Sequence, residues 1–245
     1  MFSFFKLSKT KPDLSFISAD MHSHLLPGLD DGLQEVEQTI EFVKELQDLG
    51  YQKLICTPHI LSGVYNNSPE TILPKLELVR TAFVENKIDM PIEAGAEYMV
   101  DADFENYMNE GGQLLTFGKN LILIEMSYAA ASNNIENVIF QLRLKGLQPI
   151  LAHPERYIYY YQKPEQYERF VDLGCLLQIN ILSLLGYYGE PAKNIAQDLI
   201  KKNKVSFVGT DMHHANHLNA LKTLASKKHF YKLFENIELK NKELL

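Results

Sequence analysis

Short runs of apolar residues alternate along the chain with longer segments in which apolar residues recur every three or four positions. Short continuous runs are typical of strands buried in a parallel sheet, and the longer spacing is typical of amphipathic helices. The runs predict strands at Phe16–Met21, Lys53–Cys56, Ile92–Ala96, Leu121–Met126, Pro149–Ala152, Leu176–Ile179 and Val205–Val208.

The segments between these runs predict helices. One carries apolar residues at helical spacing from Val36 to Leu46 and stops at Gly50, a residue type favoured just after a helix. Another begins at Ser68 and Pro69, an N-cap residue followed by a proline in the first turn. Pro74 lies inside this second helix, so we expect a kink or a later start there. Further helices are predicted at Asn134–Lys145, Pro164–Asp172 and Pro191–Asn203.

Strands that alternate with helices indicate parallel βαβ units and an α/β fold. An open, doubly wound sheet concentrates its chemistry at one switch point, whereas polar residues follow almost every predicted strand in this chain. A closed ring of strands produces that distribution, with the site at the carboxyl ends of the strands. We therefore predict a seven-stranded, TIM-like barrel, formed as a single domain by residues 16–245 after an N-terminal tail of residues 1–15.

Histidines and acids at the predicted strand ends are candidate metal ligands. His22-x-His24 follows the first strand and Asp211-x-His213 follows the seventh, and a period of two puts both members of each pair on one face. Imidazole and carboxylate groups without thiolates suit Mn²⁺, Fe²⁺ or Zn²⁺. The candidate ligands are His22, His24, Asp31, His59, Glu97, Glu125, His153, Asp211 and His213.

The charge of this set indicates how many ions it would hold. Asp31, Glu97, Glu125 and Asp211 bring four negative charges, which two divalent ions would neutralise. Three ions would leave a surplus of about +2 that attracts a phosphate dianion and a metal-bound hydroxide. Asp30 competes with Asp31 for one ligand position, and the spacing leaves that choice open.

Two further residues near strand ends are candidates for other roles. Arg156 lies three residues after His153, where it is placed to bind phosphate oxygens as the transition state develops. The alternative for Arg156 is a surface salt bridge, for instance to Glu155. Asn180 follows the sixth strand and is either a hydrogen-bond donor behind the ligands or a turn residue.

Composition narrows the function class. A net charge of −7 and a pI near 5.6 argue against nucleic acid as a partner. No segment approaches the roughly 18 apolar residues of a membrane-spanning helix. The N-terminus, with Phe2, Phe4 and Phe5 ahead of its lysines, lacks the order of a signal peptide. Only two cysteines are present, which suits a reducing compartment, so we expect a cytoplasmic protein.

Other phosphatase chemistries fit the sequence poorly. A thiol phosphatase needs arginine six residues after its cysteine, but Ser62 and Ile181 stand at those positions after Cys56 and Cys175. The pair Asp101-x-Asp103 resembles an aspartyl-phosphate motif without a supporting lysine, so we interpret it as a solvated loop. We also expect Cys56 to be dispensable for chemistry.

Several motifs resemble those of the polymerase-and-histidinol-phosphatase (PHP) superfamily, and more closely its capsule-associated bacterial protein-tyrosine phosphatases of the CpsB/YwqE type. The motifs are His22–Gly32, Thr57–His59, Gly95–Glu97, His153–Tyr157 and Asp211–His213. The resemblance implies a distorted (β/α)7 barrel, a trinuclear site that prefers Mn²⁺, and hydrolysis of phosphotyrosine on partner proteins. Relatives act on the tyrosine-rich tails of bacterial tyrosine kinases that control capsule export, and some assemble into rings.

The resemblance also implies roles for particular residues. One ion would be held by His22, His24, Glu97 and Asp211, a second by Glu97, Glu125 and His153, and the third by Asp31, His59 and His213. Arg156 matches the phosphate-contacting arginine of the family. Relatives place a second arginine shortly after the closing Asp-x-His, where this chain has none. Either His214 or His217 supplies the missing cation, or phosphate is held more weakly.

Tyrosines follow two of the strand ends. They are Tyr157, Tyr159, Tyr160, Tyr161, Tyr187 and Tyr188. They either frame the ring of a phosphotyrosine or pack under neighbouring helices or at a subunit contact. The functional alternatives are a phosphatase for small esters such as histidinol phosphate, an amidohydrolase-type enzyme, and a binding protein that keeps its metals for structure.

Overall fold

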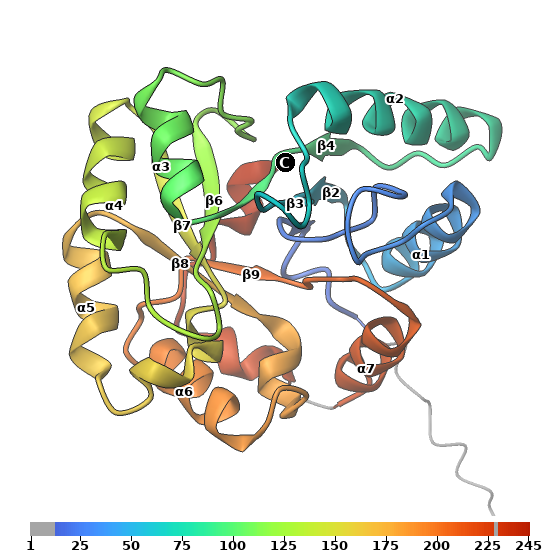
Figure 1. The fold of residues 1–245 in the computed structure, drawn as a ribbon. Helices are drawn as coiled ribbons and strands as arrows, with labels where there is room; N and C mark the ends of the chain where they lie inside the picture. Colours follow the sequence, from blue (N-terminus) through green and yellow to red (C-terminus); the bar gives the residue numbers. More distant parts are fainter. Residues whose placement is uncertain (1–12, 228–229) are drawn as a thin grey trace, which may run out of the picture.

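A ring of parallel strands forms the centre of the computed structural model, which describes residues 13–227 and 230–245 (Figure 1). The strands fall into two hydrogen-bonded groups, in the orders β1-β2-β4 and β3-β5-β6-β7-β8-β9. Their bounds are β1 (Ala19–Asp20), β2 (Lys53–Cys56), β3 (His59–Ile60), β4 (Ile92–Ala94), β5 (Glu97–Met99), β6 (Leu121–Glu125), β7 (Gln148–Ala152), β8 (Leu176–Asn180) and β9 (Phe207–Gly209).

Two of the strand positions are interrupted rather than missing. β3 continues the path of β2 after Thr57 and Pro58, and β5 continues β4 after Gly95 and Ala96. The ladder persists across the break, because the Gly95 amide donates to the Cys56 carbonyl at 2.9 Å and the Glu97 amide to the Pro58 carbonyl at 3.0 Å. The described residues therefore contain seven strand positions, which confirms the predicted strand count.

The ring closes between its first and last strands. Ser23 and Met212 form a parallel bridge beyond β1 and β9, and the His24 amide donates to the Met212 carbonyl at 2.9 Å. The Asp211 amide donates to the His22 carbonyl at 2.8 Å. An open sheet would leave these two strands as edges. The predicted barrel is confirmed.

Near the amino ends of the same two strands, one side chain completes the closure. Asn241 belongs to the short 3-10 helix η5 (Lys240–Leu244) and is fully buried. Its Nδ2 donates to the carbonyls of Ala19 and Val208 at 2.8 and 2.7 Å, and its Oδ1 accepts from the Val208 amide at 3.0 Å. The Asn241 amide thus replaces a pair of backbone hydrogen bonds between β1 and β9.

The interior of the ring below the strand ends is apolar. Its buried residues form a cluster separate from the outer core and are Ala19, Met21, Ile55, Phe117, Leu123, Ile150, Ala152, Phe207 and Leu244. Phe117 enters between β4 and β6, where Gly95 leaves room for it. A Cβ on Gly95 would lie 2.5 Å from Phe117 Cδ1, so this strand position requires glycine. We call this cluster the floor of the barrel.

Helices cover the outside of the ring (Figure 1). They are α1 (Val36–Asp48), α2 (Pro69–Glu85), α3 (Ala102–Asn109), α4 (Ile135–Leu144), α5 (Pro164–Asp172), α6 (Glu190–Lys201) and α7 (Ala215–Ala225), with 3-10 helices η1 (Pro154–Arg156), η2 (Ile158–Tyr160), η3 (Ile181–Leu185) and η4 (Phe230–Phe234). All five predicted helices are present, and α3 and α7 were not predicted. In the described residues, no helix is both long and apolar enough to cross a bilayer.

One prediction about the helices was wrong, and one of two alternatives for α2 does not occur. α2 begins at Pro69 and contains Pro74, so of the expected kink or later start, the later start is excluded. Asp101-x-Asp103 is not a solvated loop but opens α3. Asp101 caps this helix, with Oδ1 accepting from the Phe104 amide at 2.8 Å, and Asp103 lies in the first turn. Because α3 has only eight residues and buries little more than Phe104, its apolar pattern is weak.

The start of the described chain differs from the predicted first strand. β1 is shorter than Phe16–Met21, because a turn precedes it and Ser18 adopts a left-handed φ of 71°. Most of the expected tail, residues 1–12, lies outside the described residues. Leu14 is fully buried, and its amide donates to the Leu49 carbonyl at 2.7 Å.

Candidate metal centre

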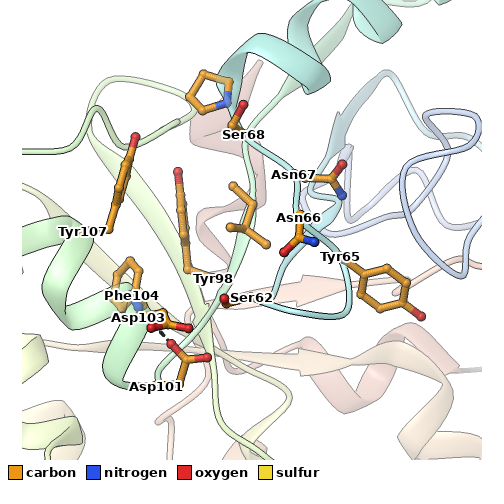
Figure 2. A pocket seen from close by; sticks show the side chains of 12 residues that line it. Ser62, Tyr65, Asn66, Asn67, Ser68, Tyr98, Asp101, Asp103, Phe104 and Tyr107 are labelled. Carbon is orange, nitrogen blue, oxygen red and sulfur yellow. Dashed lines mark hydrogen bonds between the residues drawn. The ribbon is translucent and has the colours of Figure 1, made fainter.

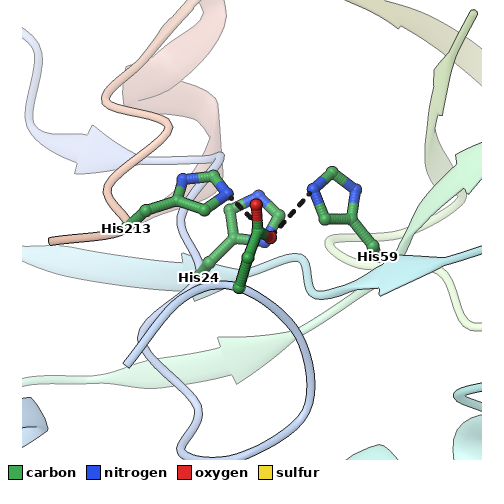
Figure 3. Close-up of side chains that lie close together, drawn as sticks. His24, His59 and His213 are labelled. Atoms are coloured by element: carbon green, nitrogen blue, oxygen red, sulfur yellow. Dashed lines mark ion pairs between the residues drawn. The ribbon is translucent and has the colours of Figure 1, made fainter. Parts of the chain in front are cut away.

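The nine predicted ligands converge at the carboxyl ends of the strands, which we call the mouth of the barrel. They come from six of the seven strand positions, each lying at a strand or in the loop after it. The set consists of His22, His24 and Asp31 after β1, His59 at the start of β3, Glu97 at the start of β5, Glu125 at the end of β6, His153 after β7, and Asp211 and His213 after β9. Figure 3 shows three of the histidines, His24, His59 and His213, gathered within this mouth.

Glu97 lies at the centre of the mouth and is fully buried. Its Oε2 is 3.1 Å from His22 Nε2, 3.1 Å from His59 Nδ1 and 3.4 Å from His24 Nε2. Its Oε1 is 3.0 Å from His153 Nε2. One carboxylate therefore faces four imidazoles, an arrangement in which a single side chain can bridge neighbouring ions.

The remaining acids extend the cluster on either side of Glu97. Glu125 Oε1 lies 2.9 Å from His59 Nδ1, and Asp211 Oδ1 lies 3.4 Å from His22 Nε2 and also 3.4 Å from His24 Nε2. At the outer rim, Asp31 Oδ1 is 3.5 Å from His213 Nε2 and 3.6 Å from His59 Nε2. All these contacts join nitrogen and oxygen atoms that can bind a metal, so the side chains direct their metal-binding atoms toward one another.

The geometry separates Asp30 from Asp31. Asp30 Oδ2 lies 2.7 Å from His24 Nδ1 and accepts from the His59 amide at 2.9 Å, while Oδ1 accepts from the Gly32 amide at 2.9 Å. Its oxygens are thus occupied by N–H groups, and it fixes the orientation of the His24 ring. Asp31 instead faces His59 and His213, which favours Asp31 as the ligand.

Four groups of side chains are close enough to hold one ion each, with ligand atoms within 4.8 Å of one another. The groups are His22, His24 and Asp211; His22, Glu97 and His153; His59, Glu97 and Glu125; and His24, Asp31, His59 and His213. They overlap more than the three expected sets. His24 also joins the outer group, and His59 also joins the two glutamates.

The electrostatics of the mouth fit a metal cluster. Burial lowers the pKa of His22, but Glu97 and Asp211 outweigh it and raise that pKa to about 9. Burial opposes the charge on Glu97, yet His22 and His59 hold its pKa well below the usual range. Two imidazole nitrogens, His22 Nε2 and His24 Nε2, nevertheless face each other at 3.3 Å. Divalent ions in place of protons would satisfy both the facing imidazoles and the buried carboxylates.

A hydrogen-bonded row behind the ligands holds them in place. Gln178 Oε1 lies 2.9 Å from His22 Nδ1, and its Nε2 donates to Asn180 Oδ1 at 3.0 Å. Asn180 Nδ2 in turn donates to Asp211 Oδ2 at 2.7 Å. Of the two roles considered for Asn180, the structure places it as a donor behind a ligand. Gln178 was missed, although Gln178-x-Asn180 has the period of two that puts both side chains inside the ring.

Two candidate ligands also have unusual backbone conformations. His153 has φ 33° and Asp211 has φ 50°, both in the left-handed region that residues with a Cβ seldom adopt. Each residue directly follows the end of a strand or lies two residues beyond it. The chain therefore turns sharply at these points and keeps both side chains directed into the mouth, as strained functional residues often do.

Arg156 lines a cavity of about 200 Å³ beside the candidate ligands. Its Nη1 donates to Asp211 Oδ2 at 2.9 Å, and its guanidinium lies between the rings of Tyr128 and Tyr188, 4.6 and 4.1 Å from their centroids. The alternative salt bridge to Glu155 is contradicted. Glu155 is fully buried and points elsewhere, accepting from the Asn180 amide and the Ser183 hydroxyl.

The two histidines proposed as substitute cations line the same cavity. His217 Nδ1 accepts from the His213 amide at 3.2 Å. Burial, with the neighbouring His214, lowers the pKa of His217 to about 4, so this ring is neutral at pH 7. That argues against His217 as the missing cation. His214 lies 4.0 Å from the His217 ring, centroid to centroid.

Most of the tyrosine run packs against the barrel instead of framing this cavity. Tyr157 is fully buried, and its hydroxyl donates to the Ala152 carbonyl at 3.0 Å and accepts from the Met126 amide at 2.9 Å. Tyr160 is also buried. Only Tyr188 of the run lines the cavity, where it is joined by Tyr128, which sequence reasoning missed. The signal for Tyr128 was its place three residues after the strand-end Glu125.

Comparison with known proteins identifies the family. Residues 18–244 match the family model described as capsular polysaccharide synthesis, CpsB/CapC. This chain belongs to the CpsB/CapC family. It is 30% identical over 230 residues to the tyrosine-protein phosphatase YwqE of Bacillus subtilis, with 90% of each chain covered. It is 28% identical to the putative tyrosine-protein phosphatase CapC of Staphylococcus aureus, over 92% of this chain and 90% of that protein.

Solved structures of CpsB/CapC proteins agree with the fold. A crystal structure from a study of YwqE from Bacillus subtilis and CpsB from Streptococcus pneumoniae, described as unique metal-dependent tyrosine phosphatases, superposes with a TM-score of 0.77. That match has 28% identity and covers 93% of this chain and 94% of the other. Histidinol phosphate phosphatase from Lactococcus lactis matches with a TM-score of 0.50 and 14% identity over 90% of this chain and 94% of its own, which shows a shared fold only.

Proposed function

We propose that this CpsB/CapC protein is a metal-dependent phosphatase that hydrolyses phosphotyrosine in proteins. The observation that carries the proposal is the convergence of nine histidine and carboxylate side chains beside a cavity of about 200 Å³ that contains Arg156. A buried set of nitrogen and oxygen donors suits divalent ions, and an adjacent arginine suits a phosphate group. The named activities of YwqE and CapC support the same substrate.

The nine side chains would hold the ions, which we propose to be three in number and preferably Mn²⁺ over Fe²⁺ or Zn²⁺. When bound, the metal ions would polarise the phosphoryl group and lower the pKa of coordinated water. The protein supplies the geometry. Asp30 fixes the ring of His24, and Gln178 fixes that of His22, so these imidazoles are already oriented before a substrate arrives.

Arg156 is proposed to hold the phosphate. Asp211 occupies its Nη1 and the rings of Tyr128 and Tyr188 pack against the guanidinium, so its other N–H groups can donate to phosphate oxygens. Burial would lower the pKa of Arg156, but the surrounding Tyr128 and Asp211 raise it above the usual range. The group therefore stays charged at any working pH.

We propose that the physiological substrate is a tyrosine-phosphorylated protein of the polysaccharide-export system, namely a bacterial tyrosine kinase with a tyrosine-rich tail. The family description, capsular polysaccharide synthesis, supports this choice. A protein substrate also agrees with the position of the cavity, whose lining residues Asp31, Tyr128 and Tyr188 lie at the outer end of the barrel and are exposed or half-buried.

The test compares substrates on one preparation. The protein is stripped with a chelator and reloaded with Mn²⁺, and kcat/KM is measured for a phosphotyrosine peptide, a phosphoserine peptide and histidinol phosphate. We expect the phosphotyrosine peptide to be preferred and activity to return only with the metal. Preference for histidinol phosphate would instead show a small-molecule phosphatase. Full activity in the chelated protein would refute the metal-dependent mechanism.

A further inference from the structure

A second cavity lies next to the candidate metal centre, between α3 and the loop that leads into α2 (Figure 2). Its volume is about 290 Å³. The residues that define its chemistry are Ile60, Tyr98, Asp101, Asp103, Phe104 and Tyr107. None of the candidate metal ligands lines it, within the described part of the chain. It is therefore a separate space from the cavity that contains Arg156.

Successive residue pairs on two neighbouring strands line the two cavities. On the paired strands β3 and β5, His59 is opposite Glu97, and the next pair is Ile60 opposite Tyr98. Because successive residues of a strand point to opposite faces, the first pair serves the metal centre and the second lines the new cavity. Tyr65, in the loop that follows β3, stacks on His59 with centroids 5.5 Å apart and also borders the new cavity.

Ring faces make up much of the cavity wall. Figure 2 shows Tyr98, Phe104 and Tyr107 on the α3 side, opposite the loop that carries Ser62 to Ser68. The hydroxyl of Tyr98 accepts from the Leu115 amide at 2.7 Å, and that of Tyr107 donates to the Gln113 carbonyl at 2.9 Å. Because both hydroxyls already have partners, Tyr107, which is 40% exposed, offers a ligand its aromatic ring, and the buried Tyr98 forms the wall behind it.

Charge at one end of the cavity selects the kind of ligand. Asp101 and Asp103 lie together there, near Ser62 (Figure 2). Asp101 uses Oδ1 to cap α3, which leaves Oδ2, and Asp103 is exposed. Among the described residues, no lysine, arginine or histidine lines this cavity, in contrast to the cavity of Arg156. Two carboxylates repel a second phosphate and attract a cation.

We propose that this cavity is a specificity subsite for a lysine or arginine side chain near the phosphotyrosine of the substrate. The apolar stem of such a side chain would lie on the ring of Tyr107, with its charge beside Asp101 and Asp103. The proposal rests on the proposed function, since it assigns the neighbour of a phosphotyrosine. Tyr65 touches His59 and also borders this cavity, so the basic residue is proposed to stand within about three residues of the phosphotyrosine.

The experiment uses Mn²⁺-loaded full-length protein and one phosphotyrosine peptide of otherwise neutral sequence. A single arginine is moved from three residues before to three residues after the phosphotyrosine, and matched peptides carry alanine or glutamate at the same position. Free phosphotyrosine serves as the substrate that cannot reach the subsite. We expect arginine at one favoured position to raise kcat/KM about five-fold or more over alanine, mainly through KM, and glutamate to lower it.

A double variant tests whether the acids cause the preference. Asp101→Asn with Asp103→Asn removes both charges, and asparagine still caps a helix well. The matched control is Asp89→Asn with Asp172→Asn, two exposed acids that precede β4 and β8 at the other end of the barrel. We expect the cavity variant to reduce the arginine preference to within about two-fold while free phosphotyrosine is hydrolysed as before. The control should keep the preference.

Two results would overturn the subsite. One is equal turnover of the arginine, alanine and glutamate peptides at every position, and the other is an arginine preference that survives the cavity variant. In both cases the phosphatase itself stands, because free phosphotyrosine is still hydrolysed. Failure of the wild-type protein to hydrolyse any phosphotyrosine substrate would refute the proposed function and this inference with it.

Discussion

The mouth and the floor of the barrel are built on the same strands but have opposite chemistry. On β6, Leu123 belongs to the apolar floor and Glu125, two residues later on the same face, belongs to the mouth. Both are buried, at 0% and 3% exposure. Burying the leucine side chain stabilises the folded protein, whereas burying a carboxylate without a partner destabilises it. The floor thus stabilises the barrel. The buried charges of the mouth destabilise it, and bound metal ions would offset that cost.

The largest effect expected from this difference is loss of activity at the mouth. His22→Ala or Asp211→Ala should lower kcat/KM on phosphotyrosine peptide by about 10³-fold or more, because each removes a candidate ligand. Chelation should have the same effect on the wild type and be reversed by Mn²⁺, which activity and metal content measured together would show. The fold should survive, since the floor is untouched. A variant with full activity and a complete metal content would contradict the assigned ligand role.

The floor should show the reverse behaviour. Phe117→Ala should lower the free energy of unfolding by about 3–5 kcal/mol, because it leaves a cavity among the buried residues around Gly95. Denaturant unfolding measures this change, and kcat/KM per folded molecule should stay within about two-fold of the wild type. Equal losses of stability and of activity per folded molecule would show that the two ends are not independent.

Arg156 belongs to the mouth but is not a candidate metal ligand, so it separates phosphate binding from metal binding. Arg156→Ala should lower kcat/KM by about 10²-fold through loss of transition-state charge stabilisation. Its metal content should remain unchanged. Arg156→Lys should recover only part of the loss, because lysine cannot bond phosphate with a planar fork or stack between Tyr128 and Tyr188 in the same way. Complete rescue by lysine would mean that charge alone matters.

The smallest effect is expected at Cys56, which lies on β2 three residues before His59. Burial raises the pKa of its thiol to about 12, so the reactive thiolate is scarce at pH 8 and alkylation should be slow. Cys56→Ser should keep its kcat/KM within about two-fold. Mass spectrometry after iodoacetamide treatment, with an activity assay, would check both points. Rapid alkylation with loss of turnover would restore the thiol mechanism that the spacing excluded.

Sequence reasoning found the mouth because apolar runs mark where strands stop, and a barrel brings all strand ends to one place. This rule alone was enough to predict His22, Glu97 and Asp211 as ligands. The choice between Asp30 and Asp31 could not be predicted, because it depends on which side chain meets the amides of Gly32 and His59 after the loop folds. Spacing along the chain does not contain that information.

Residues missed by the sequence share a different cause. Tyr128 was missed, although Tyr188 was a candidate, because the two tyrosines lie on loops 60 residues apart in sequence and only tertiary packing brings both rings to Arg156. The helix α3 was missed because it is short and buries few residues. The interruptions after β2 and β4 were missed because the ladder across them depends on pairing between neighbours.

The closure by Asn241 affects how the chain can fold during synthesis. β1 is translated among the first residues, yet the amide that joins its Ala19 to Val208 of β9 belongs to residue 241. The amino ends of both strands therefore lack this closure on the ribosome until residue 241 has emerged, and open strand edges are sites of mispairing. The closure of this barrel therefore depends on a contact between residues 222 positions apart in the sequence.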